Sequence, residues 1–164
     1  PDVHLYTTGN DPLKRDFKSF LKESFYAKYI ARLIRKYGLE DNVSFLGNLD
    51  EQHMCLRFLQ AHVFISPSSI ENSPNSLGEA MLLGTPAVSS DVGGVKNMMV
   101  HGEEGYIYPF DEPYMLAYYV EKIFADDTLA NKFSQSERKH ALITHSRSGN
   151  SREILYIYES ISTL

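Results

Sequence analysis

The sequence lacks the features that mark several specialised classes of protein. It has one cysteine, Cys55, which excludes an internal disulfide, a thiolate metal cage and therefore a disulfide-stapled secreted scaffold. No apolar run approaches the roughly 20 residues that a membrane-spanning helix needs. No Asp-x-Asp, GxGxxG or P-loop motif occurs, which argues against the usual metal-dependent, dinucleotide and ATP sites. The histidines are scattered without ligand spacing, so the sequence predicts no metal site.

The composition is that of an ordinary globular domain. The chain has 164 residues, of which 43% are hydrophobic and 23% charged. Its 16 basic and 21 acidic residues give a net charge of -5, and such a chain is a poor candidate for a nucleic-acid binder, which needs a basic footprint. The chain begins at Pro1 without an initiator Met or a signal peptide, and we expect it to be a piece of a longer protein.

Short strand-like runs alternate with helical patterns as far as Pro109, which is typical of βαβ units. The expected strands are 3–8, 42–47, 63–66, 86–89 and 105–108. The expected helices are 13–37 (with a possible break near Ser24), 51–60, 74–83, 95–100, 113–125, 127–144 and 148–162. This order predicts an α/β fold, a Rossmann-like parallel sheet with helices on both faces. Ligands bind such sheets outside the carboxyl ends of the strands, so the candidate loops are 8–12, 47–50, 66–75, 89–95 and 109–112.

The start of the helix expected after residue 73 is a candidate anion site. Ser73 is a suitable N-cap and Pro74 suits the first helical position. The next three amides then lack intrahelical partners. They belong to Asn75, Ser76 and Leu77. Together with the helix dipole, these amides predict a phosphate or pyrophosphate site that needs no metal.

Two carboxylates flank this helix start. Glu71 lies in the preceding loop, and Glu79 lies on the helix face opposite an apolar stripe that should face the sheet. The stripe consists of Leu77, Ala80, Met81 and Gly84. Because carboxylates accept hydrogen bonds from paired hydroxyls, Glu79, the helix start and Glu71 match the ribose, pyrophosphate and hexose of a nucleotide sugar. The alternatives are two surface carboxylates, or a glycosidase-like acid and nucleophile pair, which would leave the anion site unexplained.

Residues 71–94 resemble the signature of the retaining GT-B glycosyltransferases of family 4. That signature has two glutamates separated by seven residues, a Gly-x-Pro turn, a strand and a Gly-Gly turn. Here its parts are Glu71, Glu79-Ala80-Met81, Gly84-Thr85-Pro86 and Gly93-Gly94. The similarity covers about residues 3–125 and implies the C-terminal, donor-binding half of a GT-B fold. Val95-Lys96-Asn97 stands where the family often has x-Pro-Glu.

The resemblance implies a role for each candidate residue. Glu79 would hold the ribose hydroxyls, and Glu71, the catalytic candidate, would contact the donor sugar. Backbone amides between them would hold the diphosphate, and main chain of the early loops would hold the base. The remaining substrate-binding candidates are Ser73, Pro74, Asn75, Ser76, Leu77, Gly9, Gly47, Asn48, Leu49, Gly93 and Gly94. The Gly93-Gly94 pair is alternatively a mere turn.

The resemblance also implies the organisation of the whole protein. Residues 1–164 would form a single nucleotide-sugar-binding domain. Its first strand and helix, which carry an Arg and a Lys that clamp the diphosphate, would be missing from this chain, and so would the N-terminal acceptor domain. The full-length protein would move a hexose from a nucleoside diphosphate sugar to an acceptor hydroxyl in polysaccharide or glycolipid synthesis, without a cofactor or metal. This chain alone is expected to be inactive. The alternatives are a non-catalytic nucleotide-sugar-binding module and a GT-B-type epimerase or phosphorylase-like enzyme.

A basic stretch runs from Lys14 to Lys36, with eight basic and two acidic residues. One interpretation is a solvated helix face. The other is a surface that meets anionic lipid or a lipid-linked acceptor. The expected location is cytoplasmic, or peripheral on the inner face of the membrane under the second interpretation. The expected partners are the nucleotide sugar and the N-terminal domain of the same chain, and no nucleic acid.

Overall fold

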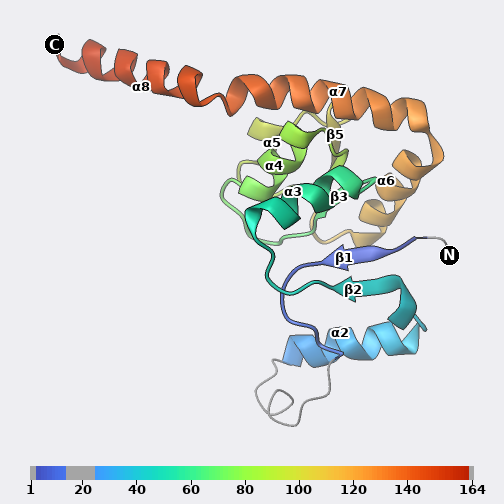
Figure 1. Cartoon of the computed structure of the whole chain (residues 1–164). Coiled ribbons are helices and arrows are strands. Elements are labelled where there is room, and N and C mark those ends of the chain that lie inside the picture. The colour runs from blue at the N-terminus through green and yellow to red at the C-terminus, as the bar shows by residue number, and fades with distance from the viewer. Residues whose placement is uncertain (1–2, 14–24, 163–164) are drawn as a thin grey trace. The chain divides into compact units, whose positions relative to one another are not determined.

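The computed structural model describes residues 3–13 and 25–162 (Figure 1). The chain divides into two compact units, Pro1–Met54 and Cys55–Leu164, and each is described by itself. Strands paired in parallel alternate with helices in both units. The α/β class predicted from the sequence is therefore confirmed.

The first unit pairs two strands in parallel and carries one described α-helix. Strand β1 (Leu5–Thr7) pairs with β2 (Val43–Phe45). Helix α2 (Phe25–Lys36) is followed by Gly38, whose φ of 61° ends the helix as the sequence predicted. A short 3-10 turn, Glu40–Asn42, leads into β2. Residues 14–24, which belong to the helix predicted over 13–37, lie outside the described residues.

The second unit contains a three-stranded parallel sheet in the order β3-β4-β5. Its strands are β3 (Phe64–Ser66), β4 (Ala87–Ser90) and β5 (Gly105–Tyr108). The helices are α3 (Glu51–Gln60), whose first residues belong to the first unit, α4 (Asn75–Leu83), α5 (Val95–Met98), α6 (Pro113–Ala125), α7 (Asp127–Thr144) and α8 (Arg147–Ser162). All five predicted strands are present, and their hydrogen bonds divide them between this sheet and the β1-β2 pair.

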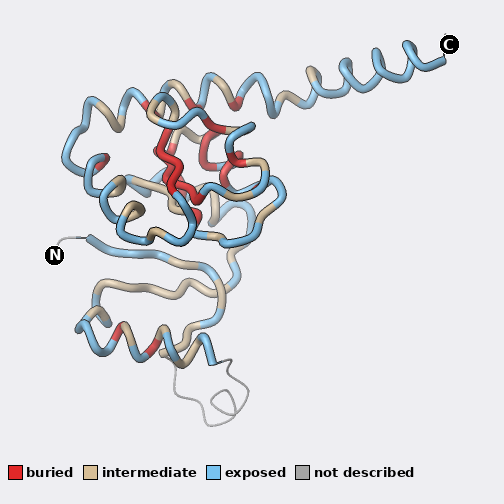
Figure 2. The backbone as a smooth tube through the Cα atoms, turned by 180° about the vertical axis from the view of Figure 1, so that it is seen from behind, coloured by how far each residue is buried: buried red, intermediate tan, exposed pale blue. Residues whose placement is uncertain are grey.

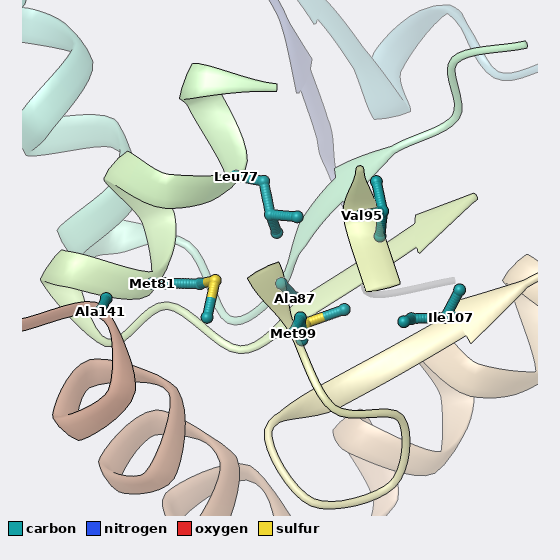
Figure 3. Packing of buried hydrophobic residues seen from close by; sticks show 7 residues of the cluster. All are labelled: Leu77, Met81, Ala87, Val95, Met99, Ile107 and Ala141. Atoms are coloured by element: carbon teal, nitrogen blue, oxygen red, sulfur yellow. The ribbon is translucent and has the colours of Figure 1, made fainter. Parts of the chain in front are cut away.

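Helices cover both faces of the β3-β4-β5 sheet because successive side chains of a strand point to opposite sides. On one face, Ala87 and Ile107 join a cluster with side chains from α4, α5 and α7 (Figure 3). The cluster consists of Leu77, Met81, Ala87, Val95, Met99, Ile107 and Ala141. On the other face, Val88 packs with Ile123 of α6 and Phe133 of α7. Figure 2 shows this concentration of buried backbone in the second unit.

Two features lie outside this core. Cys55 of α3 is half-buried and does not belong to either cluster. Helix α8 extends away from the sheet beyond α7 and buries none of its residues (Figures 1 and 2). Among residues 3–13 and 25–162, no helix combines the length and the apolar character needed to cross a bilayer.

Glu137 is a carboxyl group buried inside α7. Its side chain is fully enclosed, on the same helix face as Phe133 and Ala141, and neither carboxyl oxygen has a hydrogen-bond partner among the described residues. The nearby Glu104 is hydrogen-bonded to His140 at 2.9 Å. Burial, and secondarily the negative charge of Glu104, raises the pKa of Glu137 from 4.5 to about 10. Glu137 is therefore neutral in the folded protein at neutral pH.

We predict that Glu137 makes the protein less stable as the pH rises. The unfolded chain releases this proton above pH 4.5, and the folded chain releases it only near pH 10. Between these values the folded state holds one more proton than the unfolded state, so the free energy of unfolding falls as the pH rises. At pH 7 the loss amounts to roughly 3 kcal/mol. Glu137→Gln should flatten the pH dependence of the free energy of unfolding, measured by chemical denaturation between about pH 5 and about pH 8. Glu121→Gln on the exposed side of α6 is the control, and an equal change in both variants would contradict the assignment.

Candidate functional site

The Gly93-Gly94 turn is pressed against the backbone of the loop that carries Glu71. The amide of Gly94 donates a hydrogen bond to the carbonyl of Asn72 at 2.6 Å. Gly93 has a φ of 53°, and a Cβ added to it would collide with the carbonyl oxygen of Glu71. A Cβ on Gly94 would lie 2.9 Å from the carbonyl oxygen of Asn72. The pair is therefore more than a turn, since only glycine allows the two loops to approach this closely.

Serine hydroxyl groups hold the Glu71 loop from its other side. The buried hydroxyl of Ser90, at the end of β4, lies 2.6 Å from the carbonyl oxygen of Ser68 and 3.2 Å from that of Ser66, and can donate to either. The Ser68 hydroxyl donates to Oε1 of the Glu71 carboxylate at 3.0 Å. Glu71 is itself half-buried. Ser90 at the end of β4 thus holds the backbone of this loop, and Ser68 within the loop holds the carboxylate of the predicted sugar contact.

The start of α4 differs from the prediction in two details. Pro74 rather than Ser73 is the N-cap, and its φ of -70° and ψ of 107° are extended. Ser73 makes no capping bond, because its hydroxyl lies 3.4 Å from the sulfur of Met98. The Leu77 amide is not free, since it donates to the Pro74 carbonyl at 3.0 Å. In the described part of the chain, the amides of Asn75 and Ser76 have no acceptor, so the predicted anion site retains two donors.

Glu79 lies on the exposed face of α4, one helical turn after Asn75. Leu77, Ala80 and Met81 are buried on the other side, so the predicted stripe does face the sheet. Gly84, predicted to belong to that stripe, is instead the C-cap, with a φ of 73°. Helix α4 therefore presents the free amides and the Glu79 carboxylate together on one accessible face.

The early loops of the first unit meet through two glycines. The Gly9 amide donates to the Gly47 carbonyl at 3.0 Å, and both residues have positive φ. Apart from each glycine and its two chain neighbours, no described atom lies within 4 Å of the position that a Cβ would take there. Asn48 is exposed and Leu49 half-buried. The predicted base-contacting backbone is thus open to a ligand within this unit.

Three residues of this region were missed by the sequence analysis. Ser68 holds the Glu71 carboxylate and Ser90 holds the Ser68 carbonyl. The serine-rich loop after β3 was the only signal for Ser68, and none pointed to Ser90. Lys96 of α5 pairs with Asp91 at 2.6 Å and is 68% exposed, so it places a cation beside the Gly-Gly turn with little gain in stability. Within the described ranges, no cluster of three His, Cys, Asp or Glu side chains could hold a metal ion.

The sequence profile described as "Glycosyl transferases group 1" matches residues 22–140. Among curated proteins, YtcC of Bacillus subtilis is 26% identical to the chain over 99% of the chain and 39% of its own length. The phosphatidyl-myo-inositol mannosyltransferase of Mycobacterium leprae is 27% identical over 77% of the chain and 34% of its own length. The chain thus spans between a third and two-fifths of these relatives.

Solved structures resemble the chain over nearly its whole length. Sucrose-phosphate synthase from Thermosynechococcus elongatus has a TM-score of 0.80 and 25% identity, over 98% of this chain and 39% of its own. Anabaena HepE in complex with UDP has a TM-score of 0.77 and 23% identity, over 100% of this chain and 42% of its own. HepE has also been solved with UDP-glucose. These likenesses confirm a GT-B glycosyltransferase fold.

We predict that Gly93→Ala destabilises the protein more than Gly102→Ala. Both glycines have positive φ, but only at Gly93 would the new methyl group meet backbone. Strain at φ alone costs about 1 kcal/mol, whereas the added collision raises the loss at Gly93 to roughly 3 kcal/mol. Thermal and urea denaturation of the two variants measure the difference. Equal losses would mean that the close approach to Glu71 does not contribute to stability.

Proposed function

The chain belongs to the glycosyl transferases group 1, and from this membership we propose that it is the donor-binding part of a retaining hexosyltransferase. The enzyme would take a hexose from a nucleoside diphosphate sugar and transfer it to an acceptor hydroxyl in polysaccharide or glycolipid synthesis. Because the chain spans about two-fifths of its relatives, we propose that the acceptor site and further diphosphate contacts are contributed by protein outside these 164 residues.

The observation that carries this proposal is the fixed Glu71 loop immediately before the start of α4. The loop is hydrogen-bonded to Gly94 on one side and to Ser90 on the other. Two free amides follow at Asn75 and Ser76, and the accessible Glu79 carboxylate follows one turn later. A nucleotide sugar presents a hexose, a diphosphate and a ribose in this order. The Glu71 carboxylate can accept hydrogen bonds from the hexose hydroxyls, the two amides can donate to the diphosphate, and the Glu79 carboxylate can accept from the ribose hydroxyls. The complexes of HepE with UDP and UDP-glucose support the same class of donor.

In the proposed reaction, the bond between the anomeric carbon and the diphosphate oxygen breaks while the acceptor oxygen bonds to the same face of that carbon. The amides of Asn75 and Ser76 and the dipole of α4 stabilise the negative charge that builds on the leaving diphosphate. Glu71 accepts hydrogen bonds from sugar hydroxyls and orients the ring. The proton of the acceptor hydroxyl passes to the departing phosphate, so no protein nucleophile is needed.

The proposal is tested with a longer form of the protein and a panel of UDP-, GDP- and ADP-hexoses. Release of nucleoside diphosphate together with a glycosylated acceptor of unchanged anomeric configuration, measured by NMR, would support it. An epimerised sugar nucleotide would favour an epimerase. Binding without turnover for every donor and acceptor would favour a non-catalytic module.

We predict that Glu79→Ala weakens nucleoside diphosphate binding by about ten-fold or more, since a hydrogen bond to a charged group contributes roughly 1.5–3 kcal/mol. Isothermal titration of the chain with UDP, GDP and ADP measures this loss. The 2′-deoxy form of the best ligand provides the sharper comparison. Wild type should discriminate against the deoxy form, and Glu79→Ala should discriminate less.

The matched control is Glu121→Ala, which removes an exposed carboxylate from α6. This variant should bind like wild type. Equal affinity of wild type and Glu79→Ala for the nucleotide would exclude Glu79 as the ribose contact.

We predict that Glu71→Ala lowers turnover by roughly 100-fold while changing UDP affinity little, because its contact is to the transferred sugar. Ser68→Ala should have a smaller effect of the same kind, since it removes only the hydrogen bond to Glu71. Steady-state kinetics of a transfer-competent form, with UDP titration, separate the two quantities. Unchanged turnover with weakened UDP binding would assign Glu71 to the nucleotide instead.

A further inference from the structure

Helix α2 exposes aromatic and cationic side chains on one face. Phe25, Tyr29, Arg32 and Lys36 follow one another at intervals of four, three and four residues, which places them on a single stripe. We call this stripe the aromatic-cationic face. The buried Ala31 and Ile34 lie on the other side of the helix. Phe25 is 94% and Tyr29 56% exposed, and Arg32 and Lys36 are also exposed.

The charged side chains of α2 itself have one sign. The helix contains four basic residues and no Asp or Glu, in a chain whose net charge is -5, and the acidic Glu40 and Asp41 follow after it. The basic residues are Lys28, Arg32, Arg35 and Lys36. Tyr26 and Tyr37 are exposed at the two ends of the helix, and the Lys36 ammonium lies 5.1 Å from the centre of the Tyr37 ring. Exposed aromatic rings and basic side chains are thus combined on one short helix.

We propose that the aromatic-cationic face binds the surface of an anionic membrane. On a protein surface that meets an anionic leaflet, Lys and Arg side chains attract the lipid phosphates, and aromatic side chains reach the boundary with the acyl region. A Tyr ring suits this boundary because its body is apolar and its hydroxyl group is polar, whereas a Phe ring gains by leaving water. The surface is distinct from the candidate sugar-nucleotide residues, and the proposal does not rest on the transfer reaction.

Charge complementarity favours a membrane over other partners. The centres of protein interfaces are depleted in Lys, whereas α2 carries Lys28 and Lys36 among its four basic residues. A nucleic-acid site needs a basic track, and the net charge of the chain argues against one. An anionic leaflet instead attracts each cation additively, with a gain in partitioning of roughly five-fold for each one.

The absence of tryptophan from the chain allows a direct test. Phe25→Trp introduces a single indole on the aromatic-cationic face, and Phe110→Trp introduces one at another exposed position in the second unit. Each variant of the chain is mixed with phosphatidylcholine vesicles with or without phosphatidylglycerol. The emission of Phe25→Trp should shift to shorter wavelength only with phosphatidylglycerol, and that of Phe110→Trp should not shift.

Vesicle flotation then separates the contributions of charge and aromatic rings. Arg32→Ser with Lys36→Ser should weaken binding at least ten-fold, and so should raising the salt concentration. Phe25→Ser with Tyr29→Ser should also weaken it. Lys132→Ser with Lys139→Ser removes two exposed cations from α7 and should change binding little. Circular dichroism confirms that these surface variants retain the fold.

Several outcomes would overturn the proposal. One is that wild type does not float with vesicles that contain phosphatidylglycerol, and another is that the α2 and α7 charge variants lose binding equally. A third such outcome is that wild type binds vesicles of phosphatidylcholine alone as strongly as vesicles that contain phosphatidylglycerol. Salt-sensitive binding to a single-stranded oligonucleotide without vesicle binding would assign the face to nucleic acid. Concentration-dependent dimerisation lost in Phe25→Ser with Tyr29→Ser, again without vesicle binding, would assign it to a second copy of the chain.

Discussion

The close approach of two loop backbones, Glu71-Asn72 and Gly93-Gly94, is the constraint on which the candidate site depends. A hydrogen bond between Gly94 and Asn72 joins loops that follow different strands, β3 and β4. Any side chain at position 93 would occupy the space of the Glu71 carbonyl. Because Glu71 lies four residues before the first residue of α4, this contact fixes the backbone from which its carboxylate extends, close in sequence to the free helix amides.

The second unit separates a supporting core from an accessible edge. Apolar side chains on both faces of β4 and β5 supply the hydrophobic stabilisation, and the carboxyl ends of β3 and β4 carry the polar groups. Ser90 belongs to both parts, because it is a buried strand residue whose hydroxyl reaches the Glu71 loop. Ligand-binding groups are thus held by rigid elements while their functional atoms stay near solvent.

The sequence predicts most reliably those elements whose signals are local. Helices α6 and α7 have the predicted bounds, since Pro113 starts one and Asp126 caps the other through the amides of Thr128 and Leu129. Ser73 was wrongly predicted as a cap, because its hydroxyl contacts Met98, 25 residues away. The Gly93 contact with Glu71 is equally non-local. Glu137 did leave a signal, because it is an acidic residue at helical spacing between Phe133 and Ala141. Its raised pKa, however, follows from its burial, which only the structure shows.

The central position of β4 has a consequence for the timescale on which the candidate site can rearrange. Both neighbours must release their hydrogen bonds before β4 opens, so its amides belong to the part of this unit that exchanges with solvent most slowly. The Glu71 loop is tied to this strand by Ser90, and the Asp91 amide beyond the strand is tied to Tyr108 of β5. Helix α8, with no buried residue, stands at the other extreme. Helix α8 can therefore open and close many times while the loop before α4 keeps its shape.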